Sequence, residues 1–397
     1  MFFSKPPVNK ISNFDLLIVY SEGIATSSNS LSEDVVVPFS KESGSQNYND
    51  VYGYFLEICR KYNLKAAFTT SADIIGAGKC RSFWLYKNKV WIKVQKVGFS
   101  KTIFDKFSPT RVKIKKSRDL LFSSKQIKPF NNPDLFALCF DKQKTYERLH
   151  KFSIPTVTIK NNTKLGLYKA CKELSKQTET HPNKDDFSDE IVMKDRFGAG
   201  GLNVYKFKTG EASEMTNLVK KHETVSFIIQ PFVKFDKGLS TEKSSSPIDI
   251  RLVYLRKTIV QTYLRIAKRG EFRCNEHRGG LLKYIAVSKV PLEVRAFSKN
   301  IVKLLNTEDS LFALDFIISN DGNVYLLEAN TGPGLDWNLS LKENEIEAKK
   351  LIRIIVKDIR ERIRVKIGSS KEKTKVNSTK TFYPIGYLEE SSGVAIL

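Results

Sequence analysis

The chain has 397 residues, 41% of them hydrophobic, and its 66 lysines and arginines against 43 acidic residues give a formal charge of +23. This length predicts two or three domains, and the hydrophobic fraction excludes a wholly disordered chain. No apolar run approaches the roughly 20 residues that span a bilayer, and the N-terminal stretch "MFFSKPPVNK" reaches two prolines before the apolar core of a signal peptide can form. We therefore expect a cytoplasmic protein with no membrane partner.

The positive charge has two explanations that the sequence leaves open. It can attract an acidic or ribosomal partner, or it can reflect a general lysine bias, since the lysines are spread along the whole chain. The five cysteines are odd in number, scattered and without a Cys-x-x-Cys pair, which predicts reduced thiols rather than disulfides or a zinc site. The oligomeric state also stays open, and a homo-oligomer is compatible with the sequence.

The first third of the chain predicts an α/β domain. Strands at 14–20 and 64–70 flank a helix at 49–61, and the alternating run 82–96 predicts a hairpin. No Gly-x-Gly-x-x-Gly motif is present, so a dinucleotide site is not indicated. We expect this domain to span residues 1–130.

From residue 131 onward, the order of predicted helices and strands indicates two α+β units. We expect the first at 131–225 and the second at 226–367, with a basic linker and tail at 368–397. The predicted elements, in chain order, are a helix opened by Lys142, a helix at 163–177, strands at 190–195 and 204–208, a helix at 211–222, strands at 225–232, 249–256 and 258–267 after a Ser-rich loop at 236–247, a helix at 291–305, a hairpin at 311–335 and a basic helix at 342–365.

The hairpin has a clear turn signal. In "LFALDFIISNDGNVYLLEANTGPGL" (311–335), the Asp-Gly pair of "NDGN" predicts a two-residue turn. Asn320 then faces Asn323 across the turn, and pairing can be followed outward from there.

This register places oxygen-bearing side chains together. Asp315 falls opposite Glu328, with Cβ atoms about 4.5–5.5 Å apart, and Asn330 lies on the same face two residues on. Two close carboxylates repel unless a cation separates them. All-oxygen ligands suit a hard ion, so we expect Mg²⁺, bridging to phosphates.

A phosphate cradle is expected beside such a metal. The loop "RFGAGGLN" (196–203) supplies Gly198, Gly200 and Gly201, whose backbone N–H groups can approach an anion. Lys194 ends the strand before it, and Lys142 opens an earlier helix, so each can neutralise phosphate charge. The Walker pattern is absent, and glycine-rich hairpins without a ligand are also common.

A third group of residues is rich in arginine. Forked guanidinium groups bind phosphate and carboxylate through two hydrogen bonds and stabilise charge on a transferring phosphoryl group. For Asp249 and Arg251, an ordinary strand with a polar end is about as good an explanation. The group comprises Asp249, Arg251, Arg265, Arg273, Asn275 and Arg278.

Together these motifs resemble the ATP-grasp superfamily, and most closely its branch of RimK-type ribosomal-protein glutamate ligases. The resemblance covers about residues 134–362 and implies an ATP-grasp fold, in which two α+β subdomains grip ATP, preceded here by an α/β pre-ATP-grasp domain. The stretches that carry it are "VMKDRFGAGGLNV", "IIQPF", "DIRLVYL", "RCNEHRGG" and "ALDF…LLEANTGPGL".

The resemblance also implies ligand contacts. Asp315, Glu328 and Asn330 are expected to hold Mg²⁺, with two ions expected and Mn²⁺ as a substitute. One departure is Pro231, where the branch usually has an acid after the hinge glutamine; proline keeps its carbonyl but lacks an N–H for adenine. The residues expected to bind ATP are Lys142, Lys194, Gly198, Gly200, Gly201, Gln230, Pro231, Phe232, Asp249, Arg273 and Asn275.

The expected function is that of an ATP- and Mg²⁺-dependent ligase joining a carboxylate to an amine through an acyl phosphate, releasing ADP and phosphate. Arg251 and Arg265 are expected to orient the acceptor carboxylate, with Arg278 in the same catalytic group. The substrates can be a small molecule, a peptide or a protein. Two alternatives stay open: a kinase of a polyanionic small molecule, and an RNA- or ribosome-binding protein with a vestigial ATP site.

Overall fold

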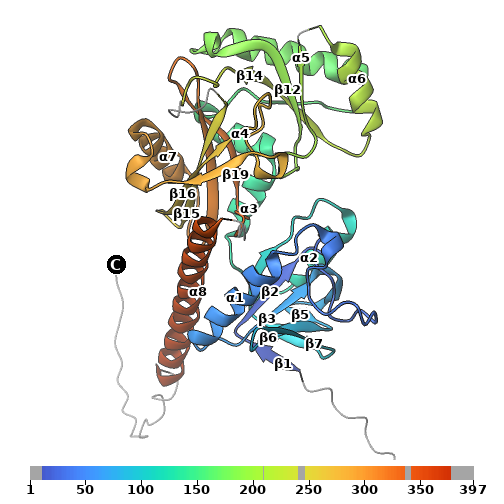
Figure 1. The fold of residues 1–397 in the computed structure, drawn as a ribbon, viewed down its shortest axis with the longest axis vertical. Coiled ribbons are helices and arrows are strands. Elements are labelled where there is room, and N and C mark those ends of the chain that lie inside the picture. The colour runs from blue at the N-terminus through green and yellow to red at the C-terminus, as the bar shows by residue number, and fades with distance from the viewer. Residues whose placement is uncertain (1–10, 209, 240–245, 336–340, 377–397) are drawn as a thin grey trace, which may run out of the picture.

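The computed structural model describes residues 11–208, 210–239, 246–335 and 341–376. An N-terminal α/β unit lies below two further sheets with their helices, and the long helix α8 runs beside it (Figure 1). Among the helices of these ranges, none combines the length and the apolar character that crossing a bilayer requires.

The N-terminal unit is built on a six-stranded sheet of order β10-β9-β2-β3-β6-β7. Because alternate residues of a strand point to opposite faces, Leu16 and Ile18 pack in the core that includes α1, whereas Leu17 and Val19 pack in the core that includes α2. The elements are α1 (Tyr48–Lys61), α2 (Val112–Leu121), β2 (Leu16–Tyr20), β3 (Ala66–Thr70), β6 (Phe83–Lys87), β7 (Val90–Val94), β9 (Thr102–Lys106) and β10 (Lys128–Pro129), with a small second sheet of β1 (Ser12–Phe14), β4 (Ile74–Gly76), β5 (Lys79–Cys80) and β8 (Gly98–Ser100).

The second unit is a four-stranded sheet of order β11-β14-β12-β13, packed against α5 and α6. Its last strand, β14, pairs with β12, so the sheet continues to Val233. The strand that follows the predicted division at residue 225 thus belongs to this sheet, and alternation within one strand does not show which sheet the strand joins. The elements are β11 (Val157–Thr158), α5 (Lys164–Glu179), β12 (Phe187–Asp195), β13 (Val204–Lys208), α6 (Ala212–Lys221) and β14 (Phe227–Val233).

The third unit is a five-stranded antiparallel sheet of order β17-β16-β15-β18-β19. Two helices from before the second sheet pack on it, since Leu135 and Leu149 share a core with Ile250 and Leu314. The elements are α3 (Pro133–Phe140), α4 (Lys142–Leu149), β15 (Ile248–Leu255), β16 (Thr258–Ile266), β17 (Leu281–Tyr284), α7 (Leu292–Leu304), β18 (Leu311–Ile318) and β19 (Val324–Asn330).

The last described helix, α8 (Lys342–Val376), ties the third unit to the first. Its Ile352 and Ile359 are buried in the same core as Phe55 of α1 and Leu311 of β18. The helix continues beyond its predicted end at 365, and the predicted tail from residue 377 onward lies outside the described residues.

The turn of the β18–β19 hairpin differs from its prediction. Ser319, not Asn320, lies opposite Asn323, and the Ser319 N–H donates a 2.8 Å hydrogen bond to the Asn323 carbonyl. The loop therefore has three residues and closes at Gly322, whose φ of +87° suits glycine. The Asp-Gly signal marked the turn correctly but gave the wrong loop length.

The pairing of the two acids is nevertheless confirmed. Phe316 lies opposite Leu326, whereas Asp315 lies opposite Glu328, so Leu327 is an extra residue in β19. This bulge shifts the register by one residue and cancels the one-residue error at the turn.

Candidate active site

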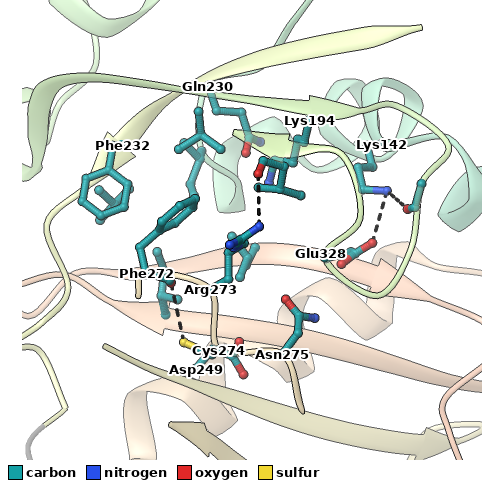
Figure 2. Close-up of a pocket in the computed structure, with 18 of the residues that line it drawn as sticks. Lys142, Lys194, Gln230, Phe232, Asp249, Phe272, Arg273, Cys274, Asn275 and Glu328 are labelled. Atoms are coloured by element: carbon teal, nitrogen blue, oxygen red, sulfur yellow. Dashed lines mark hydrogen bonds and ion pairs between the residues drawn. The ribbon is translucent and has the colours of Figure 1, made fainter. Parts of the chain in front are cut away.

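A cavity of about 830 Å³ lies between the second and third sheets (Figure 2). Strands β12 and β14 form one wall, and β15, β16, β18 and β19 form the other. All eleven residues expected to bind ATP line this one cavity, although they are spread over 134 residues of sequence: Lys142, Lys194, Gly198, Gly200, Gly201, Gln230, Pro231, Phe232, Asp249, Arg273 and Asn275.

One end of the cavity is apolar. The rings of Phe232 and Phe272 meet edge to face with centroids 5.9 Å apart, and Leu327 lines the wall from the β19 bulge. Sequence reasoning missed Phe272, Leu327 and Val192, because an apolar residue in a strand or loop reads as ordinary core. This end of the cavity therefore offers the flat, apolar surfaces against which a nucleobase can pack.

Pro231 lies beyond the end of the β11–β14 pairing, so its missing N–H removes no hydrogen bond to β11. The pairing of β11 with β14 ends at Ile229, so in the described strands the edge of β14 is open at Pro231. The neighbouring Gln230 side chain is buried and donates a 2.7 Å hydrogen bond to Thr156 Oγ1. At Pro231 itself, the backbone therefore offers a carbonyl and no N–H to a base.

The opposite end of the cavity is cationic. Lys194 is only 8% exposed, and burial, with the nearby positive charge of Lys142, lowers its pKa to about 8 against the opposing effect of Glu328. The Lys142 ammonium donates to the Gly198 carbonyl and lies 3.3 Å from Glu328 Oε1. Two ammonium groups with one carboxylate leave this end short of negative charge, which a polyphosphate would supply.

The glycine loop lines this cavity and is hydrogen-bonded to Arg278. Arg278 donates hydrogen bonds of 3.3 and 3.2 Å to the Gly201 carbonyl from Nε and Nη2. Gly200 and Gly201 have φ values of +67° and +72°, and a Cβ on Gly201 would lie 2.9 Å from Asn275 Oδ1. The left-handed backbone conformation therefore favours glycine at position 201, and a Cβ there would displace the Asn275 side chain.

Four charged side chains form a buried ion network beside the cavity. Arg251 contacts both oxygens of Asp315 at 2.6 Å, and Arg265 bridges Asp249 at 2.7 Å and Asp315 at 2.8 Å. Burial opposes ionisation of Asp315, but the two guanidinium groups hold its pKa below the usual value. Arg251 and Arg265 thus already have carboxylate partners within the protein.

Asp315, Glu328 and Asn330 fit a hard cation. Asn330 Oδ1 is buried with no hydrogen-bond partner, and Asp315 Oδ1 accepts only from Arg251 Nε, which leaves it a further lone pair. Within the described ranges no three His, Cys, Asp or Glu side chains form a metal cluster, so a metal here would rest on two carboxylates and one amide. This oxygen set matches Mg²⁺ completed by phosphate oxygens.

A second cavity, of about 2060 Å³, adjoins the first. Lys142, Glu328 and Asn275 line both cavities. Its far side is the carboxyl end of the parallel strands β2 and β9, represented by Tyr20 and Lys106, where open α/β sheets usually bind ligands. The expected catalytic residues Arg251, Arg265 and Arg278 line it, as does Asn330.

A family model described as the RimK-like ATP-grasp domain matches residues 140–355, more than half of the chain. The chain belongs to the RimK-like ATP-grasp family. The matched range contains every expected ATP- and metal-binding residue, from Lys142 to Asn330.

Two relatives illustrate this membership. The probable alpha-L-glutamate ligase of Vibrio parahaemolyticus is 30% identical over 146 residues, which are 37% of this chain and 44% of the relative. The probable alpha-L-glutamate ligase of Coxiella burnetii is 29% identical over 168 residues, 42% of this chain and 50% of the relative. The chain therefore spans about half the length of the curated relatives it matches.

Solved structures share the ATP-grasp fold at low identity. D-alanyl-alanine synthetase A from Vibrio cholerae has a TM-score of 0.55 and 13% identity, covering 88% of this chain and 98% of its own. The RimK domain ATP-grasp protein from Sphaerobacter thermophilus has a TM-score of 0.51 and 14% identity, covering 85% and 98%. This breadth of match includes the N-terminal unit, so the fold is an ATP-grasp fold with a preceding α/β domain, as expected.

Proposed function

We propose that this member of the RimK-like ATP-grasp family is an ATP- and Mg²⁺-dependent ligase that joins a carboxylate to an amine. The observation that supports it best is the convergence of eleven expected nucleotide contacts on one cavity. Glu328 lines its cationic end, Asn330 lines the adjoining cavity, and Asp315 is paired with Glu328 in the sheet behind them. We also propose that the preceding domain ends near residue 130, where β10 closes its sheet. The five free cysteines favour the cytoplasm.

The nucleotide has one orientation that satisfies both ends of the cavity. Adenine lies against Phe232 and Phe272, with backbone carbonyls near Pro231 available to its amino group. The phosphates reach Lys142, which donates to the Gly198 carbonyl of the glycine loop, and Lys194, which lines the same cavity. Phosphate stabilises the charge of the buried Lys194 most, because that charge is poorly solvated in the free site.

Glu328, Asn330 and Asp315 would hold two Mg²⁺ ions, and Mn²⁺ could replace them. When bound, the metal neutralises charge on the phosphates during transfer. Arg251 and Arg265 position Asp315 for this task through the ion network, which refines their expected role as direct contacts of the acceptor. Arg278 donates to a loop carbonyl and has no carboxylate partner among the described residues, so it is the guanidinium best placed for an acceptor carboxylate.

The acceptor enters the larger cavity with its carboxylate toward Arg278. A carboxylate oxygen attacks the γ-phosphorus, the bond to the β-phosphate oxygen breaks and ADP leaves. The amine nitrogen then attacks the acyl carbon, phosphate departs with the electron pair of the carbon–oxygen bond, and the amine loses a proton. The products are an amide, ADP and free phosphate.

The test is a screen of ADP release by the purified chain against amino acids, short peptides and ribosomal proteins. The last are included because the charge of +23 would attract an acidic or ribosomal partner. The proposal expects ADP and free phosphate in equal amounts, only when carboxylate and amine are both present. ADP without free phosphate would identify a kinase, and salt-sensitive RNA binding without ATP turnover would replace the ligase with an RNA-binding protein.

A further inference from the structure

An unbroken stack of planar groups runs along the wall of the larger cavity. The ring centroids of Phe136 and Phe140 lie 5.9 Å apart with an interplanar angle of 9°, and those of Phe140 and Phe197 lie 5.2 Å apart with an interplanar angle of 28°. Phe136 and Phe140 share one face of α3, since residues four apart are neighbours on a helix. Phe197 belongs to the glycine loop, directly before Gly198. We call Phe136, Phe140 and Phe197 the phenylalanine ladder.

Each end of the ladder is covered by an arginine. The Arg118 guanidinium carbon lies 3.9 Å from the centroid of Phe136, and that of Arg196 lies 5.3 Å from the centroid of Phe197. These distances are within the range of cation–π attraction. The ladder therefore links α2 of the N-terminal domain to the loop that closes the nucleotide cavity.

Both arginines are themselves fixed by carboxylates. Arg118 Nη2 lies 2.8 Å from Asp105 Oδ2 at the carboxyl end of β9. Arg196 contacts both oxygens of Asp141 at 2.6 Å, and Asp141 also caps the N-terminus of α4 by accepting from the backbone N–H of Gln143. The two ends of the stack are thus anchored on separate units of the fold.

The ladder lies outside the nucleotide cavity. Its three rings line the larger cavity and do not line the 830 Å³ cavity. They are only half-buried, although three phenylalanines in water would normally be covered by core. Their stacked contacts supply attraction beyond simple burial, and Phe197 lies in the loop that carries Gly198.

We propose that the phenylalanine ladder is a positioning device that holds the glycine loop closed, so that nucleotide affinity depends on Arg118 in the N-terminal domain. This rests on the proposed nucleotide site. If Phe197 moved away with the loop, the Phe140–Phe197 contact would be lost. The stack therefore shifts the loop toward the closed state before nucleotide arrives, which lowers the cost of ordering the loop on binding.

The experiment compares Phe140→Leu, which keeps an apolar side chain but removes the ring, with Phe140→Tyr, which keeps the ring. Binding of Mg²⁺ with a non-hydrolysable ATP analogue is measured by calorimetry, and amide hydrogen exchange of 196–203 is measured in the free protein. We expect Phe140→Leu to raise the Kd about 2- to 10-fold, the range that stacked pairs contribute, and to speed loop exchange. Phe140→Tyr should restore both.

Two further variants test the path of the effect. Arg118→Lys keeps the charge beside Asp105 but lacks the planar group, so it should raise the Kd in the same direction although α2 does not line the nucleotide cavity. Phe122→Leu is the matched control, because the Phe122 ring also contacts Arg118, at 5.0 Å, and does not lead to the loop. Its Kd should stay at the wild-type value.

The outcomes separate the ladder from the site on which it rests. An unchanged Kd and unchanged loop exchange in Phe140→Leu would overturn the ladder, as would an equal loss in Phe122→Leu. If the wild-type chain bound no nucleotide, the proposed function would fail, and the exchange of 196–203 in the same variants would still decide whether the ladder holds the loop.

Discussion

Replacing Lys194 with methionine should make the nucleotide-free protein more stable and abolish nucleotide binding. Lys194 is 8% exposed and its pKa falls from an ordinary 10.5 to about 8, chiefly because burial removes water from the ammonium. At about 1.4 kcal/mol per pH unit, this shift means that the charged form costs the folded state about 3 kcal/mol. Methionine has a similar length, is apolar and adapts to irregular space.

The effect has a defined pH window. Below pH 8 Lys194 is protonated in both the folded and the unfolded states, so the full cost is present. Between pH 8 and 10.5 the unfolded state binds more protons, so wild-type stability rises with pH. The stability gap between Lys194→Met and wild type should therefore be largest near pH 7 and shrink toward pH 10.

The assay is denaturant unfolding at pH 7 and pH 9.5, with binding of the Mg²⁺–ATP analogue measured at pH 7. Lys220→Met is the control, because Lys220 is an exposed lysine on α6 outside both cavities, and it should change neither quantity. A Lys194→Met protein that binds the analogue like wild type, or whose stability gap is the same at both pH values, would refute this reasoning.

Three further predictions concern the loop, the metal ligands and the tail. Gly201→Ala should raise the KM for ATP several-fold, since alanine pays roughly 1–2 kcal/mol in the left-handed conformation and its Cβ would approach Asn275 Oδ1 to 2.9 Å; an unchanged KM would show that the loop tolerates a side chain. Glu328→Gln should abolish ADP release while the circular dichroism spectrum stays unchanged, and retained turnover would remove Glu328 from the metal site. Deleting 368–397 should leave nucleotide affinity unchanged, because the residues lining the cavity lie within 142–328; calorimetry showing weaker binding would assign part of the site to the tail.

The pairing of Asp315 with Glu328 could be predicted because side-chain parity in a hairpin depends only on the turn and the residue count. That success involved two compensating features. The turn has one more residue than the Asp-Gly signal indicated, and the bulge at Leu327 adds one residue to the opposite strand. A bulge depends on tertiary packing, so no local pattern in β19 indicated it.

Other parts of the site depend on contacts between distant segments. Phe136 and Phe140 are spaced as an ordinary core face of a helix, and nothing local indicates that Phe197 completes their stack. Asp141 likewise reads as a helix cap, whereas its second role, fixing Arg196, joins residues 55 apart in sequence. That β14 joins the second sheet could not be predicted for the same reason, because strand partners are chosen in three dimensions.

The most direct test of the proposed chemistry follows an oxygen atom. An acceptor found in the ADP-release screen is labelled with ¹⁸O in its carboxylate and incubated with the amine, ATP and Mg²⁺, and the released phosphate is analysed by mass spectrometry. Activation through an acyl phosphate predicts that one labelled oxygen appears in each free phosphate. Unlabelled phosphate, or phosphate that stays attached to the acceptor, would contradict the proposed ligase mechanism.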